Sequence, residues 1–217
     1  MYIKELIDYA NSINNGVERK YEPNINDKGK LGKIVEEGLF HNKPNSSPKP
    51  DLPCGYDIKA THFKKLRNGC RNAKERLTIT NVGTTNDYTT FDHLINSEQL
   101  EDSNSFKKMN FVLFYFDYNK NTPVMDKLFL GAIMVNFNEI RPDIKEIIYN
   151  DYKDIQYKIR NKCVSQTGQK YLHIHPHGSR FSKTRALGFK NKLVTILFGQ
   201  FMNIEIQERG NSVYINI

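Results

Sequence analysis

The spacing of apolar residues near the N-terminus predicts two helices joined by a polar segment. Apolar positions recur every three or four residues over 1–14 and again from Gly29 to Phe40, which is the periodicity of an amphipathic helix. In the second helix, Glu36 lies off the apolar stripe. Residues 15–30 are polar and rich in Asn, Gly and Lys, and four prolines interrupt 41–55. Both of these segments are therefore expected to be loops.

The middle of the chain carries the strongest strand signals. Residues 110–116 read Asn-Phe-Val-Leu-Phe-Tyr-Phe, an apolar run typical of a buried central strand. Residues 128–137 follow after a turn rich in Asp, Asn and Pro, so the two segments predict a hairpin. The remaining pattern predicts strands at 56–61, 77–80, 172–175 and 211–217, and helices at 143–157 and 190–202. This order indicates an α/β or α+β fold with a mixed sheet.

Composition restricts the class of protein further. A chain of 217 residues with 38% hydrophobic residues is long enough for a substantial core, and we expect a single domain over 1–217. The mean hydropathy is −0.63, and no apolar run approaches the roughly 18 residues of a membrane span. Charged residues interrupt the apolar start of the chain, unlike a signal peptide. Three cysteines without C-x-x-C spacing argue against a disulfide framework and a zinc ribbon. A soluble cytoplasmic protein is expected.

The net charge of +8 is concentrated in two runs without Asp or Glu. One extends from Ile58 to Lys74, and the other from Ile155 to Ile204. Two basic segments far apart in sequence can line a single cleft for a phosphate backbone. The alternative is that both are ordinary solvated faces. The basic residues that we single out for DNA contact are Lys64, Lys65, Arg67, Arg180, Lys183, Arg185 and Lys190.

The segment from Pro50 to Ala60 carries the most specific chemistry. It reads Pro-Asp-Leu-Pro-Cys-Gly-Tyr-Asp-Ile-Lys-Ala. Residues two apart in a strand share a face, so Asp57 and Lys59 project together, and Asp51 on the preceding turn can reach the same point. Two carboxylates and a carbonyl oxygen, here that of Ile58, can hold Mg²⁺. A lysine beside the metal site can orient the nucleophile and offset developing charge.

This P-D-x(n)-(D/E)-x-K pattern is that of metal-dependent nucleases, although Asp-x-Lys also occurs on ordinary surface strands. Glu36 on the preceding helix can aim a further carboxylate at the same metal. The alternative for Glu36 is a solvated position on its helix.

In this order along the chain, these segments resemble the MutH-like family of DNA endonucleases. That family includes mismatch-repair nicking enzymes and type II restriction enzymes that cut GATC, with the small restriction enzymes BcnI and MvaI as more distant relatives. The segment Gly29 to Leu39 resembles the glycine-rich helix with an active-site Glu, and Asp51, Asp57 and Lys59 resemble the catalytic core. The family usually has Glu where Asp57 stands. Lys108, before the central strand, matches a further active-site lysine.

The resemblance implies a restriction-endonuclease-like PD-(D/E)xK core, with a mixed sheet flanked by helices and two lobes around a DNA cleft. The catalytic lobe would cover about residues 1–140, and the DNA-contact segments about 141–217. The implied reaction is Mg²⁺-dependent hydrolysis of double-stranded DNA that leaves 5′-phosphates. The implied metal ligands are Asp51 and Asp57, with Glu36 assisting and Lys59 acting at the nucleophile.

One segment departs from the family pattern. MutH-type enzymes read bases with Arg-Pro-Lys, where this chain has His175-Pro176-His177. Because His lacks the fork with which Arg binds guanine, either a neighbour such as Arg180 takes that role or the target is not GATC. We hypothesise that the loop from His175 to Arg185 reads bases in the major groove. His173, His175 and His177 also alternate as zinc ligands sometimes do, or they are plain structural and surface histidines.

The sequence thus favours a sequence-specific type II restriction endonuclease, expected to be a monomer in solution and possible as a dimer on DNA. Two alternatives stay open. One is a DNA-binding protein without catalysis, which the charge alone would allow. The other is a structure-specific or mismatch-repair nicking nuclease of the same fold.

Overall fold

A computed structural model describes residues 4, 5, 7, 8, 30–43, 47, 49–123, 127–165, 167–179, 181–210 and 212–217. Within the first predicted helix, the four described residues have helical backbone. The rest of that helix and the predicted loop that follows it lie outside the described residues, apart from residue 30, which opens the next helix.

The larger of the two sheets has six strands in the order β5-β4-β1-β2-β9-β8. β1 and β4 are parallel, and every other neighbouring pair is antiparallel. The strands are β1 (Asp57–Lys65), β2 (Arg71–Ala73), β4 (Phe111–Asp117), β5 (Phe129–Val135), β8 (Ile206–Arg209) and β9 (Ser212–Ile215). The sheet is mixed, as the sequence pattern predicts, and its central strand β4 is buried over six of its seven residues.

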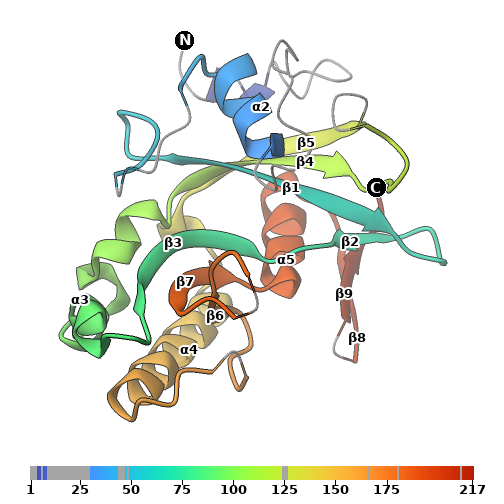
Figure 1. Cartoon of the computed structure of the whole chain (residues 1–217). Coiled ribbons are helices and arrows are strands. Elements are labelled where there is room, and N and C mark those ends of the chain that lie inside the picture. The colour runs from blue at the N-terminus through green and yellow to red at the C-terminus, as the bar shows by residue number, and fades with distance from the viewer. Residues whose placement is uncertain are drawn as a thin grey trace.

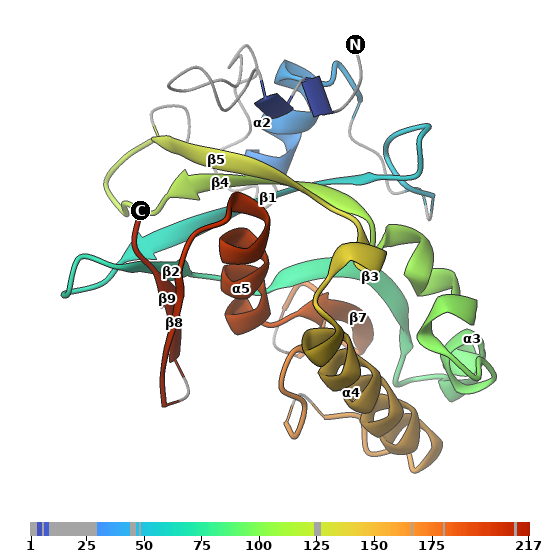
Figure 2. The ribbon, with the colours of Figure 1, turned by 180° about the vertical axis from the view of Figure 1, so that it is seen from behind.

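Helices cover both faces of this sheet (Figures 1 and 2). α2 (Lys30–Gly38) lies on one face, where Ile34 packs in one cluster with Ile58. α5 (Asn191–Met202) lies on the other, where the ring of Phe198 is centred 4.2 Å from that of Tyr115. Side chains alternate between the faces of a strand. Because Ile58 faces α2, the neighbouring Asp57 and Lys59 face the opposite side.

A second sheet of three antiparallel strands stands on that opposite side, in the order β3-β7-β6. Its strands are β3 (Leu77–Thr84), β7 (Thr184–Phe189) and β6 (Leu172–Pro176). α4 (Pro142–Arg160) packs against β6. The two sheets, α4 and α5 share one continuous hydrophobic core.

A buried carboxylate on α4 fixes the start of β6. Asp151 accepts hydrogen bonds from the backbone N–H groups of Lys170, Tyr171 and Leu172, at 2.7, 2.6 and 2.8 Å. Three donors on one carboxylate satisfy its lone pairs in a site with little water. The contact therefore sets the position of the strand that carries His173 and His175.

Gly188 allows the strands of the smaller sheet to approach closely. A Cβ atom at this position would lie 2.6 Å from the carbonyl oxygen of Leu77 on β3 and 3.0 Å from Cε1 of His175 on β6. Real Cβ atoms do not make contacts as short as the first of these. The spacing between β3, β7 and β6 thus depends on a missing side chain.

Several predicted elements are confirmed. The helix expected at 29–40 is α2, the hairpin is β4–β5, and the helices expected at 143–157 and 190–202 are α4 and α5. The strands expected at 56–61, 77–80, 172–175 and 211–217 correspond to β1, β3, β6 and β9. β1 and β3 each continue four residues beyond the predicted end.

Other elements had no clear signal in the sequence. β2 is three residues long, and β7 reads Thr-Arg-Ala-Leu-Gly-Phe, without the alternation of a half-buried strand. The short helices are η1 (Tyr88–Phe91), α3 (Asp92–Ile95), η2 (Leu100–Asp102), η3 (Asn104–Lys108) and η5 (Phe137–Glu139). None of the helices in the described part of the chain has the length and apolar character needed to cross a membrane.

Candidate active site

The first residues of β1 carry a cluster of charged side chains. Asp57 is fully buried, and its Oδ2 atom accepts a hydrogen bond from the ammonium group of Lys59. That ammonium also lies 3.4 Å from the carbonyl oxygen of Ile79 on β3. The strand thus brings Asp57 and Lys59 together on one face, as their spacing predicts, and Lys59 bridges the two sheets.

The turn before β1 folds Asp51 back onto the strand. The backbone N–H of Asp51 donates to Oδ1 of Asp57 at 3.3 Å, and Oδ2 of Asp51 accepts from the N–H of Ile58 at 3.0 Å. Gly55, with φ of +87°, closes the turn with a hydrogen bond to the carbonyl oxygen of Leu52. The two aspartates therefore lie against each other although they are six positions apart in the sequence.

Lys108 joins the same cluster from the end of η3, the short helix that precedes the neighbouring strand β4. Its Nζ atom lies 3.3 Å from Oδ1 of Asp57. The parallel pairing of β1 with β4 explains this position, because Asp57 lies opposite Phe111 and Lys108 comes just before that residue at the end of η3. The structure brings two lysines to one buried carboxylate.

Burial, the neighbouring carboxylates and the lysines together set the pKa values of Asp51, Asp57 and Glu36. Burial opposes ionisation of Asp57, but the charge of Lys59, the hydrogen bonds to Asp51 and Lys59, and the charge of Lys108 together lower its pKa. Burial and the hydrogen-bonded carboxyl of Asp57 raise the pKa of Asp51. Burial, and then the charges of Asp51 and Asp57, raise the pKa of Glu36 to about 7 against the opposing charge of Lys59. Acids held in this way favour a nearby cation.

The residues fit a divalent metal of the magnesium type. Asp51 and Asp57 offer carboxylate oxygens, which such hard cations prefer, and Ile58 lies between Asp57 and Lys59 on β1. Each carboxylate oxygen has two lone pairs, so the hydrogen bonds already made leave room for coordination. Across the described ranges, no three His, Cys, Asp or Glu side chains are grouped to hold a metal. The ligand set that the sequence predicts, Asp51, Asp57 and the carbonyl oxygen of Ile58, stays a candidate.

The basic residues of the first run lie at the other end of β1. Lys64 and Lys65 end the strand, Arg67 follows in the turn, and all three are exposed. Lys65 lies six positions beyond Lys59 along the strand, which corresponds to about 20 Å. The structure therefore does not bring these side chains to the carboxylate cluster.

The C-terminal basic residues divide into exposed and engaged groups. His177 and Lys183 are exposed between β6 and β7. The guanidinium of Arg185 donates to the carbonyl oxygen of Ser182 at 2.6 Å, and the ammonium of Lys190 donates to that of Gln169. Arg180 lies outside the described residues.

The histidines of β6 are not equivalent. His173 and His175 are each 3% exposed, and their rings stack with centroids 4.7 Å apart. Nε2 of His175 lies 3.3 Å from Oγ1 of Thr78 on β3, whereas His177 is exposed. Sequence reasoning missed Thr78 and Arg76, which line the same cavity, because only the pairing of β3 with β7 and of β7 with β6 brings them there.

Acid should destabilise the protein through this histidine pair. Burial, then the positive charges of His175, Arg76 and Lys190, lowers the pKa of His173 to about 3. Burial, then the charges of Arg76, His177 and Arg185, lowers that of His175 to about 4. Between the ordinary value of 6.5 and these values, the unfolded chain binds protons that the folded chain does not. The free energy of unfolding should therefore fall as the pH drops from 6.5 towards 4.

The variant His173→Phe, which keeps the ring stack, should lose less stability than the wild type between pH 7 and 4.5 in urea denaturation. His177→Gln, at the exposed position two residues on, is the control and should keep the acid sensitivity of the wild type. If the free energies of unfolding of His173→Phe and the wild type change in parallel with pH, the assignment of a buried, neutral His173 is wrong.

The chain belongs to the MutH family. The family model described as "DNA mismatch repair enzyme MutH" matches residues 40–151, just over half of the chain. This stretch contains Asp51, Asp57, Lys59 and Lys108, whereas Glu36 and the histidines of β6 lie outside it. The mixed α/β fold, with a sheet flanked by helices, fits that family.

A particular relative is a restriction enzyme. The chain is 27% identical over 183 residues to the protein named type II restriction enzyme Sau3AI, from Staphylococcus aureus. The similar region covers 76% of this chain and 36% of the relative. The chain thus spans about a third of the length of that protein.

Proposed function

We propose that the protein is a Mg²⁺-dependent, sequence-specific endonuclease of double-stranded DNA, of the type II restriction class, that leaves 5′-phosphates. One observation carries the proposal. Asp51, Asp57, Lys59 and Lys108 converge at the start of β1, within the stretch that matches the MutH family. The similarity to a restriction enzyme over most of the chain supports restriction as the form of the activity.

In this proposal the chain's own residues have distinct roles. Asp51, Asp57 and the carbonyl of Ile58 would hold Mg²⁺, which when bound supplies Lewis-acid stabilisation of the phosphate. Lys59, held by Asp57 and the Ile79 carbonyl, orients the attacking water and offsets charge on the phosphate. Lys108 adds a second positive charge at Asp57.

Glu36 is suited to move a proton. With a pKa of about 7, its carboxylate is present near neutral pH and still basic enough to accept a proton from water. Burial and the neighbouring aspartates are the cause of that value. That pKa therefore matches an assisting role in activating the nucleophile.

We infer that the DNA reaches the carboxylate cluster at the start of β1, where Lys59 contacts β3 of the smaller sheet. In this proposal 1–217 forms one domain, with a catalytic lobe over about 1–140 and DNA-contact segments in 141–217. The exposed His177 and Lys183 contact bases and backbone, while Lys64, Lys65 and Arg67 contact phosphates about 20 Å from the cleavage point. The protein acts as a monomer in solution and stays in the cytoplasm.

Unmethylated phage DNA incubated with the protein and Mg²⁺ should give a ladder of discrete fragments, because a sequence-specific enzyme cuts at fixed positions. Agarose electrophoresis measures this, and EDTA should prevent it. A smear would indicate a nonspecific nuclease instead, and intact DNA would contradict catalysis.

The description of the matching family favours a second candidate, a nicking nuclease of mismatch repair. The product formed from supercoiled plasmid DNA distinguishes the two candidate functions. A restriction enzyme converts it to linear DNA, whereas a nicking enzyme stops at the open circle.

A further inference from the structure

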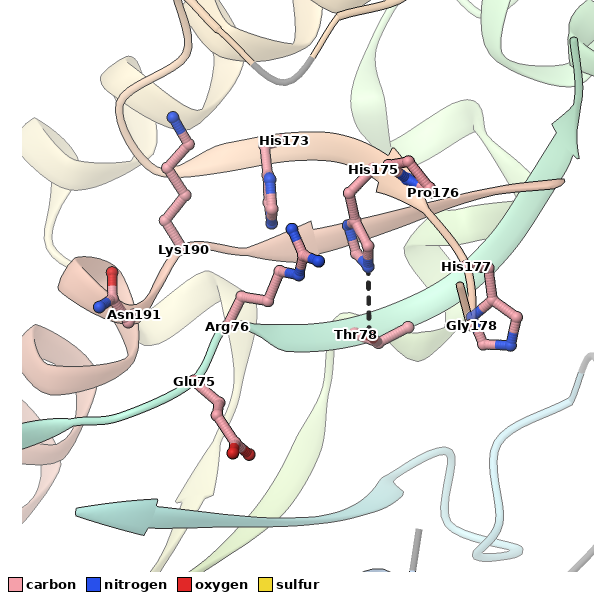
Figure 3. Close-up of a pocket in the computed structure, with 10 residues that line it drawn as sticks. All are labelled: Glu75, Arg76, Thr78, His173, His175, Pro176, His177, Gly178, Lys190 and Asn191. Atoms are coloured by element: carbon pink, nitrogen blue, oxygen red, sulfur yellow. Dashed lines mark hydrogen bonds between the residues drawn. The ribbon is translucent and has the colours of Figure 1, made fainter. Parts of the chain in front are cut away.

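A second feature of the structure lies next to the part of β3 that contacts the catalytic cluster. It is a cavity of about 890 Å³ between β3, β6 and the start of α5 (Figure 3). Thr78, which contacts His175 in this cavity, directly precedes Ile79, whose carbonyl contacts Lys59. The side chains of Arg76, Thr78, His173 and His175 line this cavity.

We propose that this cavity reads a guanine of the DNA target, with the guanidinium of Arg76 forked onto the acceptor edge of the base and His173 and His175 lining the contact. The proposal rests on the proposed function and deepens it, because it names the group that selects the sequence. Arg76 belongs to neither basic run and to none of the motifs shared with the MutH-like family.

The two imidazoles show that the cavity is built for a polar ligand. His173 and His175 are each 3% exposed. Among the described residues, Nε2 of His173 and Nδ1 of His175 have no hydrogen-bond partner. A buried ring nitrogen without a partner costs free energy. A polar base edge that enters the cavity would provide the missing partners.

The charges around the cavity select an electron-rich edge over a metal cation. Figure 3 shows Arg76, directly before β3, pointing towards the imidazoles, and Glu75 pointing away from them. Glu75 pairs instead with Lys74 at 2.9 Å. The positive charge of Arg76 acts on both histidines. A cation at the imidazoles would be repelled, whereas guanine O6 and N7 are acceptors in the major groove.

Arg76 also supplies what the His-Pro-His segment lacks. A guanidinium presents two parallel N–H groups that match O6 and N7 of guanine, which imidazole cannot do. Here the fork comes from the residue before β3, across the smaller sheet from the segment that reads bases in MutH-type enzymes. Because β3 also contacts Lys59, the strand joins base recognition to the catalytic lysine.

The test combines a charge-conserving substitution with a change in one base atom. Fragment ends from the phage digest define the target, and short duplexes then carry 7-deazaguanine, which lacks the N7 acceptor, at one guanine at a time. In single-turnover cleavage, the wild type should slow at least about fivefold at one of these guanines. Arg76→Lys keeps the charge but loses the fork, so it should cut the natural target about 10- to 100-fold more slowly. The cleavage rate of this variant should also stay the same when 7-deazaguanine replaces guanine at that position.

The matched control is Arg209→Lys on β8, an exposed position in the larger sheet. It should cut like the wild type and keep the full penalty at the sensitive guanine. If Arg76→Lys also keeps that penalty, or if the mapped target contains no guanine, the assignment of Arg76 is overturned while the nuclease stands. If the wild type does not cut DNA at all, the proposed function fails and the assignment with it.

Discussion

Lys59→Ala should reduce DNA cleavage by about 10²- to 10⁴-fold while most DNA binding remains. Lys59 is held by the buried Asp57 and by the Ile79 carbonyl, so its ammonium is fixed where the proposed reaction develops charge. Binding depends mainly on phosphate contacts spread over many basic residues. Single-turnover cleavage and an electrophoretic shift assay measure the two quantities separately.

Lys153→Ala is the matched control for this experiment. Lys153 is an exposed lysine on α4, so its removal changes the net charge equally without touching the cluster. It should cut at the wild-type rate. In Lys59→Ala, the buried Asp57 keeps one positive partner, Lys108, at 3.3 Å. Thermal unfolding of both variants shows whether each protein is still folded. A folded Lys59→Ala protein with full activity would refute the active-site assignment.

Asp151→Ala should lower the free energy of unfolding by about 3–5 kcal/mol. The substitution leaves three backbone N–H groups at the start of β6 without their acceptor. Two of them belong to the buried residues Tyr171 and Leu172, where water replaces the carboxylate poorly. Urea denaturation at pH 7 measures the loss.

Asp143→Ala provides the comparison within the same helix. Asp143 is exposed in the first turn of α4 and pairs with Arg141, so its loss should shift the denaturation midpoint far less. Asp151→Asn, which keeps one acceptor oxygen, should fall between the two. If Asp151→Ala unfolds at the same urea concentration as Asp143→Ala, the carboxylate does not hold β6.

A short stretch of sequence was sufficient to predict the helices and strands whose characteristic pattern lies entirely within that stretch. The apolar run of β4, the turn residues after it and the periodicity of α4 each lie within a few consecutive residues, and all were predicted. The pairing of Asp57 with Lys59 was equally local, since it needs only the alternation of a strand. By contrast, β2 pairs with β9 through Arg71 and Ile215, a contact across most of the chain that no local window contains.

The candidate site shows the same limit. Asp51 was found from its place on the turn before the strand and Lys108 through the family resemblance, but Arg76 and Thr78 had no local signal. They join the histidines of β6 only through the intervening β7. The distance of the first basic run from the cluster also needed the structure, because an extended strand carries Lys64 and Lys65 about 20 Å from Lys59.

The close approach at Gly188 limits how this site can change during evolution. A methyl group there would press on the Leu77 carbonyl and on His175, and β3 would have to move away from β7. The next residues of β3 include Thr78, which contacts His175, and Ile79, which contacts Lys59. Under the roles proposed above, a single added carbon would disturb base recognition and the catalytic lysine together, so new specificities would have to arise from the residues around the cavity while position 188 stays glycine.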